Sequence, residues 1–344
     1  MKVLLDGIIF SLQQHAGISV YFKELIKHAD AHGLTGVVQF GPLKQSLPQG
    51  LKNIALDRVT YRPLERYRSC RVPASASIFH SSYYRLPSII NMPSVVTVHD
   101  FVYERYVKGP KRWVHMHQKH AAIRAAQAVI CVSEATRQDL FEFVGGIPGQ
   151  AVYVIHNGVS EVFRPLSLTQ APAPAPYVLY VGERRGYKNF IRLLAAMEFL
   201  PDFELHCVGG GPFQPRELAG VPASVTCRVK HVGFVDDESL NDIYNQAVCL
   251  VYPSSYEGFG IPIVEAMRAG CPVVSVECKA VMEVGGAALT IAEGLDPRAL
   301  ADAILKTTSS NRTSLIERGL SVAQAYSWEK THAKTLEVYR SLVG

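Results

Sequence analysis

The chain has 344 residues, of which 48% are hydrophobic and 19% are charged, and its formal net charge is +5. One hydrophobic core rarely serves a chain of this length, so we expect two domains. No apolar run is long enough to cross a bilayer, and Asp6 interrupts the apolar start of the chain where a signal peptide would continue. These features predict a cytoplasmic protein and exclude an integral membrane protein.

The seven cysteines are scattered along the chain, and no two of them form a C-x-x-C pair. Several lie inside apolar runs, for example Cys131 and Cys249. Buried reduced thiols are therefore favoured over disulfides or a zinc site.

The net positive charge is unevenly placed along the chain, with two groups of basic residues in the first half. One group is Arg58, Arg62, Arg66, Arg68 and Arg71, and the other is Lys108, Lys111, Arg112, Lys119 and Arg124. Such a half could face an anionic membrane or a phosphate-bearing acceptor, and a merely solvated surface is an equally good interpretation. Nucleic acid is not favoured as a partner, because no recognisable binding motif combines aromatic residues with these charges.

Short β-rich runs alternate with helical patterns in the first half. Mostly continuous apolar runs predict strands at residues 2–6, 36–40, 77–81, 95–99, 128–133 and 152–156. A helix is expected from Val20 to a C-cap at Gly33, because apolar residues recur there at helical spacing. Ser133 offers an N-cap for a later helix. This alternation indicates βαβ units.

Alternate prolines between residues 171 and 176 interrupt both periodicities and favour an extended path. We place the domain junction there, which gives an N-terminal domain of residues 1–170 and a C-terminal domain of residues 171–326. In the second domain, strands are expected at residues 177–181, 204–208, 229–235, 249–252, 272–276 and 289–291. Helices open at Asp236 and Asp296, and an amphipathic helix lies within residues 327–344. The predicted fold is α/β, with two doubly wound Rossmann-like domains facing across a cleft.

Ligands of open α/β sheets bind at the carboxyl ends of the strands, so the loops after strands are candidate sites. Gly17 stands at a helix start, where the backbone can approach a phosphate closely, although a plain turn is an equally good interpretation. His99 closes a strand and could donate a hydrogen bond to substrate or stabilise developing charge. A purely structural histidine is the alternative there.

The loop of residues 182–189 carries two arginines and a lysine between a strand and a helix. Arg184 or Arg185, together with Lys188, suits a diphosphate, because fixed cations can neutralise a leaving group without a metal. The spacing is not that of a P-loop, and a solvated basic turn is the alternative.

The most specific pattern is Glu257-Gly-Phe-Gly-Ile-Pro262, which is followed by Glu265. Pro262 suits the first position of a helix, so the glycines lie directly before a helix N-terminus. The unpaired backbone N–H groups of such a terminus can bind an anion. Glu265 is then expected in the first helical turn and Glu257 on the loop before it. Two carboxylates would repel a phosphate, so we expect them to accept hydrogen bonds from hydroxyls on either side of it.

At these residues the chain resembles glycosyltransferase family 4, retaining enzymes with the GT-B fold. The family's E-x7-E pattern matches Glu257 and Glu265, and its basic loop matches residues 182–189. Residues 132–136 and 155–159 match recurrent blocks of its first domain. The resemblance covers essentially the whole length, and bacterial polysaccharide mannosyl- and rhamnosyltransferases are similar. It also implies that a C-terminal helix of residues 327–344 crosses back onto the first domain.

The resemblance implies a role for each site residue. Glu257 and His99 would be catalytic residues that contact the donor sugar, and Glu265 would bind the ribose hydroxyls. The other substrate-binding residues would be Gly17, Arg184 and Lys188 at the diphosphate, Gly233 and Phe234 near the base, and Gly258, Phe259, Gly260 and Ile261 along the phosphates and sugar. Many members carry the arginine where this chain has Glu183, so Arg184 is favoured over Arg185 as its substitute.

The implied activity is transfer of a hexose, such as mannose, from a nucleotide-diphosphate sugar, with a GDP-sugar favoured over a UDP-sugar and no metal cofactor. The acceptor would be a saccharide or lipid-linked saccharide of bacterial surface polysaccharide synthesis, including lipopolysaccharide. Residues 61–71, 81–85 and 101–113 are its candidate surfaces, and the protein could contact the inner face of the membrane. A nucleotide-sugar epimerase of similar architecture and a non-catalytic nucleotide-sugar-binding protein are the alternatives.

Overall fold

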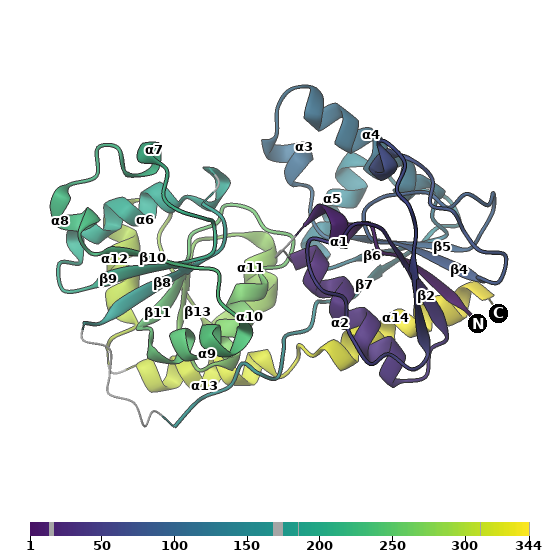
Figure 1. Cartoon of the computed structure of the whole chain (residues 1–344). Helices are drawn as coiled ribbons and strands as arrows, with labels where there is room; N and C mark the ends of the chain where they lie inside the picture. Colours follow the sequence, from purple (N-terminus) through teal and green to yellow (C-terminus); the bar gives the residue numbers. More distant parts are fainter. Residues whose placement is uncertain (14–16, 168–174, 185, 310, 344) are drawn as a thin grey trace. The chain divides into compact units, whose positions relative to one another are not determined.

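The computed structural model describes residues 1–13, 17–167, 175–184, 186–309 and 311–343 (Figure 1). The chain divides into two compact units, one of residues 1–158 with residues 327 onward, and one of residues 159–326. Each unit is built on one sheet in which all paired strands are parallel. The predicted α/β class with two doubly wound Rossmann-like units is confirmed.

The first unit contains a seven-stranded sheet with the strand order β3-β2-β1-β4-β5-β6-β7. Its strands are β1 (Val3–Asp6), β2 (Gly36–Phe40), β3 (Ile54–Arg58), β4 (Ile78–Ser81), β5 (Ser94–Val98), β6 (Ala128–Cys131) and β7 (Ala151–Val154). The helical elements are α1 (Ile9–Leu12), α2 (Gly17–Ala31), η1 (Glu65–Tyr67), α3 (Val102–Tyr106), α4 (Pro110–Ala125), α5 (Glu134–Phe143) and α14 (Trp328–Val343).

Strand β3 was not predicted from the sequence. It is an edge strand whose residues after Ile54 are exposed, so it lacks the apolar pattern of the buried strands. It is held from α2, where the Asp30 carboxylate accepts hydrogen bonds from the backbone N–H groups of Asn53 at 2.6 Å and Ile54 at 2.9 Å. The backbone N–H of Lys52, followed by these two N–H groups, lowers the pKa of Asp30. The strand therefore depends on a contact that its own residues do not encode.

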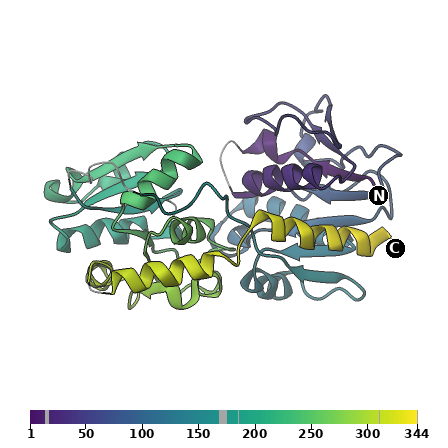
Figure 2. The same ribbon diagram turned by 90° about the horizontal axis from the view of Figure 1, so that it is seen from below.

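Helix α14 packs against α2 and β4 of the first unit (Figure 2). The Tyr339 hydroxyl lies 2.6 Å from Nδ1 of His80, whose Nε2 lies 2.9 Å from the Thr97 hydroxyl. At the start of the helix, a Cβ on Gly158 would lie 2.2 Å from the backbone nitrogen of Trp328, so only glycine fits there. The last helix is thus part of the core of the first unit.

The second unit contains a six-stranded sheet with the strand order β10-β9-β8-β11-β12-β13. Its strands are β8 (Tyr177–Val181), β9 (Glu204–Val208), β10 (Val229–Gly233), β11 (Cys249–Tyr252), β12 (Val273–Ser275) and β13 (Leu289–Ile291). The helical elements are η2 (Gly186–Lys188), α6 (Phe190–Ala196), η3 (Met197–Phe199), α7 (Pro215–Leu218), α8 (Ala223–Thr226), α9 (Asp237–Gln246), α10 (Ile261–Arg268), α11 (Lys279–Gly285), η4 (Gly286–Ala288), α12 (Pro297–Lys306) and α13 (Arg312–Ala323).

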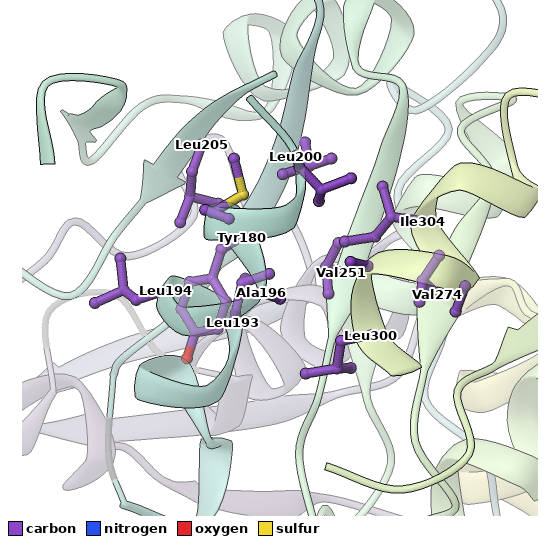
Figure 3. Packing of buried hydrophobic residues seen from close by; sticks show 14 of the residues in the cluster. Tyr180, Leu193, Leu194, Ala196, Leu200, Leu205, Val251, Val274, Leu300 and Ile304 are labelled. Carbon is purple, nitrogen blue, oxygen red and sulfur yellow. The ribbon is translucent and has the colours of Figure 1, made fainter. Parts of the chain in front are cut away.

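One face of the second sheet is covered by α6 and α12, and Figure 3 shows how their side chains gather with those of the strands. Leu193 and Leu300 are fully buried against Val251 and Val274 of the central strands. A large apolar side chain buried in this way stabilises the fold by about 1.5–3 kcal/mol. This packing fixes the strands whose carboxyl ends carry the candidate site.

The two units divide between Gly158 and Val159, before the expected junction at residue 171. Residues after the division already pack on α9: the Phe163 ring lies 5.9 Å from that of Tyr244, and the Arg164 N–H donates to the Asn241 side chain at 3.0 Å. The contacts of Phe163 and Arg164 are therefore with the second unit. Most of the proline repeat, residues 171–174, lies outside the described residues.

The predicted helix caps are confirmed at Ser133, Asp236 and Asp296, each of which accepts a backbone N–H from its own first turn. The cysteines are free thiols, and all are buried except Cys227. In the described ranges, no helix has the length and hydropathy needed to cross a membrane.

Candidate active site

The loops after β8 and β11 are joined at the carboxyl end of the second sheet. Asn189 occupies a left-handed conformation at the start of α6, with φ 51°. Its side-chain amide donates to the Pro253 carbonyl at 2.8 Å and to the Ser255 hydroxyl at 2.7 Å. The Ser255 N–H in turn donates to the Tyr187 carbonyl at 2.9 Å. These bonds fix Lys188 beside the loop that carries Glu257.

Lys188 and Glu257 form an ion pair, with 2.8 Å between Nζ and Oε1. The two side chains are only 15% and 14% exposed, and the ammonium also lies 5.4 Å from the centre of the Tyr252 ring. The structure thus brings together the lysine predicted for the diphosphate and the carboxylate predicted for the sugar. Their functional roles stay predictions.

Helix α10 begins at Ile261, and its cap residue Gly260 has φ 96°. A side chain would be strained in this conformation, and its Cβ would also lie 3.2 Å from the Ile263 side chain. Pro262 is the second helical residue rather than the first, so Glu265 begins the second turn. Its expected place in the first turn is therefore wrong by one residue. Phe259 is buried against Tyr326 with 5.6 Å between ring centres, while Gly258 lies in the loop before it.

Glu265 lies beside the buried hydroxyl of Tyr244, which donates to its Oε2 at 3.1 Å. Burial, with a smaller contribution from the charge of Asp237, raises the pKa of Glu265 to about 8, although the Tyr244 hydrogen bond opposes that shift. The folded chain therefore holds the proton of this carboxyl group to higher pH than the unfolded chain does. In the protonated state it can both accept and donate hydrogen bonds to a diol.

Glu265 is expected to make the protein less stable as the pH rises. The unfolded chain ionises this carboxyl near 4.5, whereas the folded chain holds the proton up to about pH 8. Between these values the group lowers the unfolding free energy by about 1.4 kcal/mol per pH unit. Glu265→Gln should therefore gain stability relative to the wild type as the pH rises through this window.

Urea unfolding at several pH values measures this effect. Glu238→Gln, which changes an exposed carboxylate on α9, is the matched control. Parallel pH profiles for the wild type and Glu265→Gln would show that the carboxyl is ionised in the folded chain and would contradict the prediction.

Arg184 is held inside the protein, so its predicted role at the diphosphate stays a prediction that the ligand-free contacts do not favour. Its side chain is 2% exposed, and its Nε donates to Glu217 at 2.8 Å. The terminal nitrogens donate to the carbonyls of residues 209–212, including Gly211 at 2.8 Å. The guanidinium lies 4.6 Å from the centre of the Phe213 ring. Nε and both terminal nitrogens are hydrogen-bonded to the protein, so Arg184 supports the loop after β9. Arg185 lies outside the described residues.

A cavity of about 630 Å³ lies beside these loops at the carboxyl ends of β8, β9 and β10. Phe234 lines it and is 63% exposed, directly after Gly233, which ends β10 with φ 89°. Its lining is Glu183, Arg184, Gly186, Ile191, Gly210, Pro212, Gln214, Arg216, Glu217 and Phe234. The place predicted for the base is therefore hollow and has an exposed aromatic ring at its edge.

His99 follows β5 in the first unit, and its ring stands edge-on to that of Tyr21 with 5.0 Å between centres. Burial and, to a smaller extent, the charge of Lys119 lower the pKa of His99 to about 3. Its buried Nε2 has no hydrogen-bond partner among the described residues. The imidazole is neutral and can make one more hydrogen bond. This is consistent with the predicted contact between His99 and the donor sugar, which stays a prediction.

Gly17 is the first residue of α2 and is exposed. This agrees with its predicted place at a helix start, while its role at the diphosphate stays a prediction. The preceding residues 14–16 lie outside the described part of the chain.

Two tyrosines and a glutamate were not predicted to belong to the site. Tyr244 contacts Glu265, Tyr252 is hydrogen-bonded to Glu257, and Glu217 binds Arg184. Tyr252 ends a strand next to the motif, so its position was a usable signal. Tyr244 and Glu217 lie on other helices and leave no local sequence signal.

Residues 16–162 match the family Glycosyltransferase Family 4, and residues 175–310 match Glycosyl transferases group 1. The chain is 29% identical over 287 residues to the O-antigen chain mannosyltransferase B of Escherichia coli, covering 77% of this chain and 74% of that protein. It is 36% identical over 193 residues to a D-inositol 3-phosphate glycosyltransferase of Corynebacterium urealyticum, covering 50% of this chain and 44% of that protein.

Solved structures show the same fold at low sequence identity. A sucrose-phosphate synthase from Thermosynechococcus elongatus superposes with a TM-score of 0.80 at 21% identity, over 99% of this chain and 98% of the other. The Anabaena protein HepE, solved in complex with UDP and glucose, superposes with a TM-score of 0.72 at 17% identity, over 99% and 100%. With two family matches that together span most of the sequence, the chain belongs to the family 4 glycosyltransferases and has their GT-B fold.

Proposed function

We propose that this glycosyltransferase moves a hexose, with retention of anomeric configuration, from a nucleotide-diphosphate sugar to a saccharide or lipid-linked saccharide acceptor. The observation that carries the proposal is the Lys188–Glu257 ion pair, in which Glu257 stands in the loop that leads to the glycine-capped start of α10. An ammonium next to a helix N-terminus provides positive potential for a departing diphosphate. Glu257 holds that ammonium in place until the donor arrives.

The remaining residues have complementary roles in this proposal. Glu265, which is oriented by the Tyr244 hydroxyl, binds the ribose hydroxyls, and Phe234 covers the base at the edge of its cavity. His99 binds a hydroxyl of the donor sugar through Nε2, the ring nitrogen for which the described residues provide no partner. No metal is part of the proposed reaction, because Lys188 and the helix terminus act on the leaving group.

GDP-mannose is the proposed donor, and the product belongs to bacterial surface polysaccharide synthesis, such as that of lipopolysaccharide. The similarity to an O-antigen mannosyltransferase supports this choice. The complex of HepE with UDP and glucose makes UDP-glucose the natural comparison. A peripheral contact with anionic membrane is also part of the proposal, supported by the exposed side chains of Arg58, Arg68 and Arg71.

Thermal unfolding with GDP, GDP-mannose, UDP and UDP-glucose tests the donor. A ligand that binds only the folded chain, at about 100 times its Kd, adds about 2.7 kcal/mol of stability. We expect GDP-mannose to raise the melting temperature more than UDP-glucose does, and we expect transfer to a mannoside acceptor to follow. Stabilisation by UDP-glucose alone would overturn the choice of donor.

The same samples distinguish the other activities. Conversion of the donor to a different nucleotide sugar without acceptor would indicate an epimerase. Tight donor binding with neither transfer nor hydrolysis would indicate a binding protein, and either result would contradict the proposal.

A further inference from the structure

The first unit contains a cavity of about 520 Å³ that none of the site residues lines. Its lining comes from three separate segments: Tyr67, Arg68, Ser69, Tyr84, Arg85, Leu86, Trp113, Val114, His117, Gln118 and Ala121. The volume lies in the range of ordinary ligand sites, roughly 300–1,000 Å³. The fold thus gathers parts of all three stretches that the sequence predicts for the acceptor.

Exposed aromatic rings form the edge of this cavity. Trp113 is 66% exposed and Tyr67 is 50% exposed, although both are large apolar side chains. Trp113, His117 and Ala121 are spaced four residues apart and therefore share one face of α4. Amphipathic rings left open at a concave surface are typical of binding sites.

The buried part of the cavity offers no free charge. Arg85 is 3% exposed, and its guanidinium lies 3.2 Å from Asp6 and 3.1 Å from Glu65, so its charge is already balanced. Arg68 lies at the exposed edge and donates through Nε to the Pro63 carbonyl at 2.9 Å. The positive charge of Arg68 therefore lies at the solvent-exposed edge, and the buried part of the lining has only the balanced charge of Arg85 to offer a phosphate or lipid headgroup. The lining favours a neutral ligand.

Gln118 provides a side-chain amide that can form a hydrogen bond with a ligand hydroxyl. Its Nε2 donates to the Arg66 carbonyl at 2.6 Å, while its Oε1 has no partner within the described ranges. An amide oxygen accepts hydrogen bonds, so a ligand hydroxyl could donate the hydrogen bond that Gln118 Oε1 lacks. His117 is exposed on the same helix face and can bind a second hydroxyl.

We propose that this cavity binds a sugar residue of the acceptor chain other than the one that receives the new sugar. The proposal rests on the function proposed above and specifies its acceptor. A pyranose has one face of C–H groups that packs on Trp113 or Tyr67, and its hydroxyls reach Gln118 and His117. Tyr84 lines the cavity and is also hydrogen-bonded to the backbone of His99. The cavity therefore adjoins the strand end where the donor sugar is expected.

Intrinsic fluorescence tests binding without any donor. The chain has two tryptophans, and Trp328 is buried at 6% exposure, so Trp328→Phe leaves Trp113 as the only reporter. Titration with α-linked mannotetraose should shift its emission, and methyl mannoside should have a much smaller effect. Titration with maltotetraose, a glucose oligosaccharide of the same length, shows whether binding depends on the identity of the sugar. Saturation-transfer NMR on the wild type with the same sugars replaces this measurement if the variant is unstable.

Acceptor kinetics test the same site during transfer. Trp113→Ala and Tyr67→Ala should each raise KM for the tetrasaccharide about tenfold and leave kcat, the donor KM and the methyl mannoside KM unchanged. Phe141→Ala, which removes an exposed ring from α5, is the matched control and should change none of these values.

The outcomes separate the two proposals. If sugar binds at Trp113 but the protein transfers no sugar, the proposed function is overturned and the proposal that the cavity binds a sugar is supported. Transfer with no emission change and no dependence on acceptor length would overturn the cavity proposal. Loss of binding to anionic vesicles in Trp113→Ala, with soluble acceptors unaffected, would also overturn it and assign the aromatic edge to a membrane contact.

Discussion

Replacing Lys188 by methionine is expected to lower kcat for sugar transfer by about 100-fold to 1,000-fold, the usual cost of removing one group that stabilises a leaving group. Methionine keeps the length and packing of the side chain but removes the ammonium 2.8 Å from Glu257. Glu257→Gln should cause a comparable loss. Each change also leaves one partly buried charge unpaired, which lowers the unfolding free energy by about 1–3 kcal/mol.

The double variant Lys188→Met with Glu257→Gln distinguishes catalysis from structure. Neither charge is then left without a partner, so most of the lost stability should return, while transfer should stay as slow as in the single variants. Recovery of both stability and rate would show that the pair only supports the fold. Lys230→Met is the matched control, because Lys230 forms a more exposed pair with Glu204 at 2.6 Å in the same unit. It should change stability by about 1 kcal/mol or less and leave the rate unaltered.

Arg184→Met is expected to lower the unfolding free energy by about 3–5 kcal/mol, because it leaves the Glu217 carboxylate and the carbonyls of residues 209–212 without their shared donor. Denaturant unfolding of the full chain measures the change. Glu217→Met should cause a loss of similar size, since it leaves a guanidinium at 2% exposure without its counterion.

Arg298→Met provides the comparison for Arg184. Its guanidinium also lies 4.6 Å from an aromatic ring, that of Phe199, but its side chain is exposed. That variant should keep most of its stability. Wild-type stability in Arg184→Met, combined with a large rise in the donor KM, would contradict this structural role and support the sequence prediction that Arg184 holds the diphosphate.

The sequence determined the features that depend on neighbouring residues. Continuous apolar runs marked the buried parallel strands, and side-chain caps marked the helices that open at Ser133, Asp236 and Asp296. The positive φ of Gly260 follows from the same local motif that identified the family. Such features are readable because strand burial, capping and backbone strain act over a few positions.

Tertiary structure alone decided which partner each charged side chain has. Arg184 and Lys188 stand in one loop and look alike in sequence, yet Glu217 from α7 binds the first inside the protein, while Glu257 pairs with the second at the carboxyl end of the sheet. The edge strand β3 and the hydrogen bond between Tyr339 of α14 and His80 also depend on partners distant in sequence. Long-range contacts impose no periodicity on the chain. For this reason the sequence identified the family and the motif, whereas the folded chain assigned each side chain its partner.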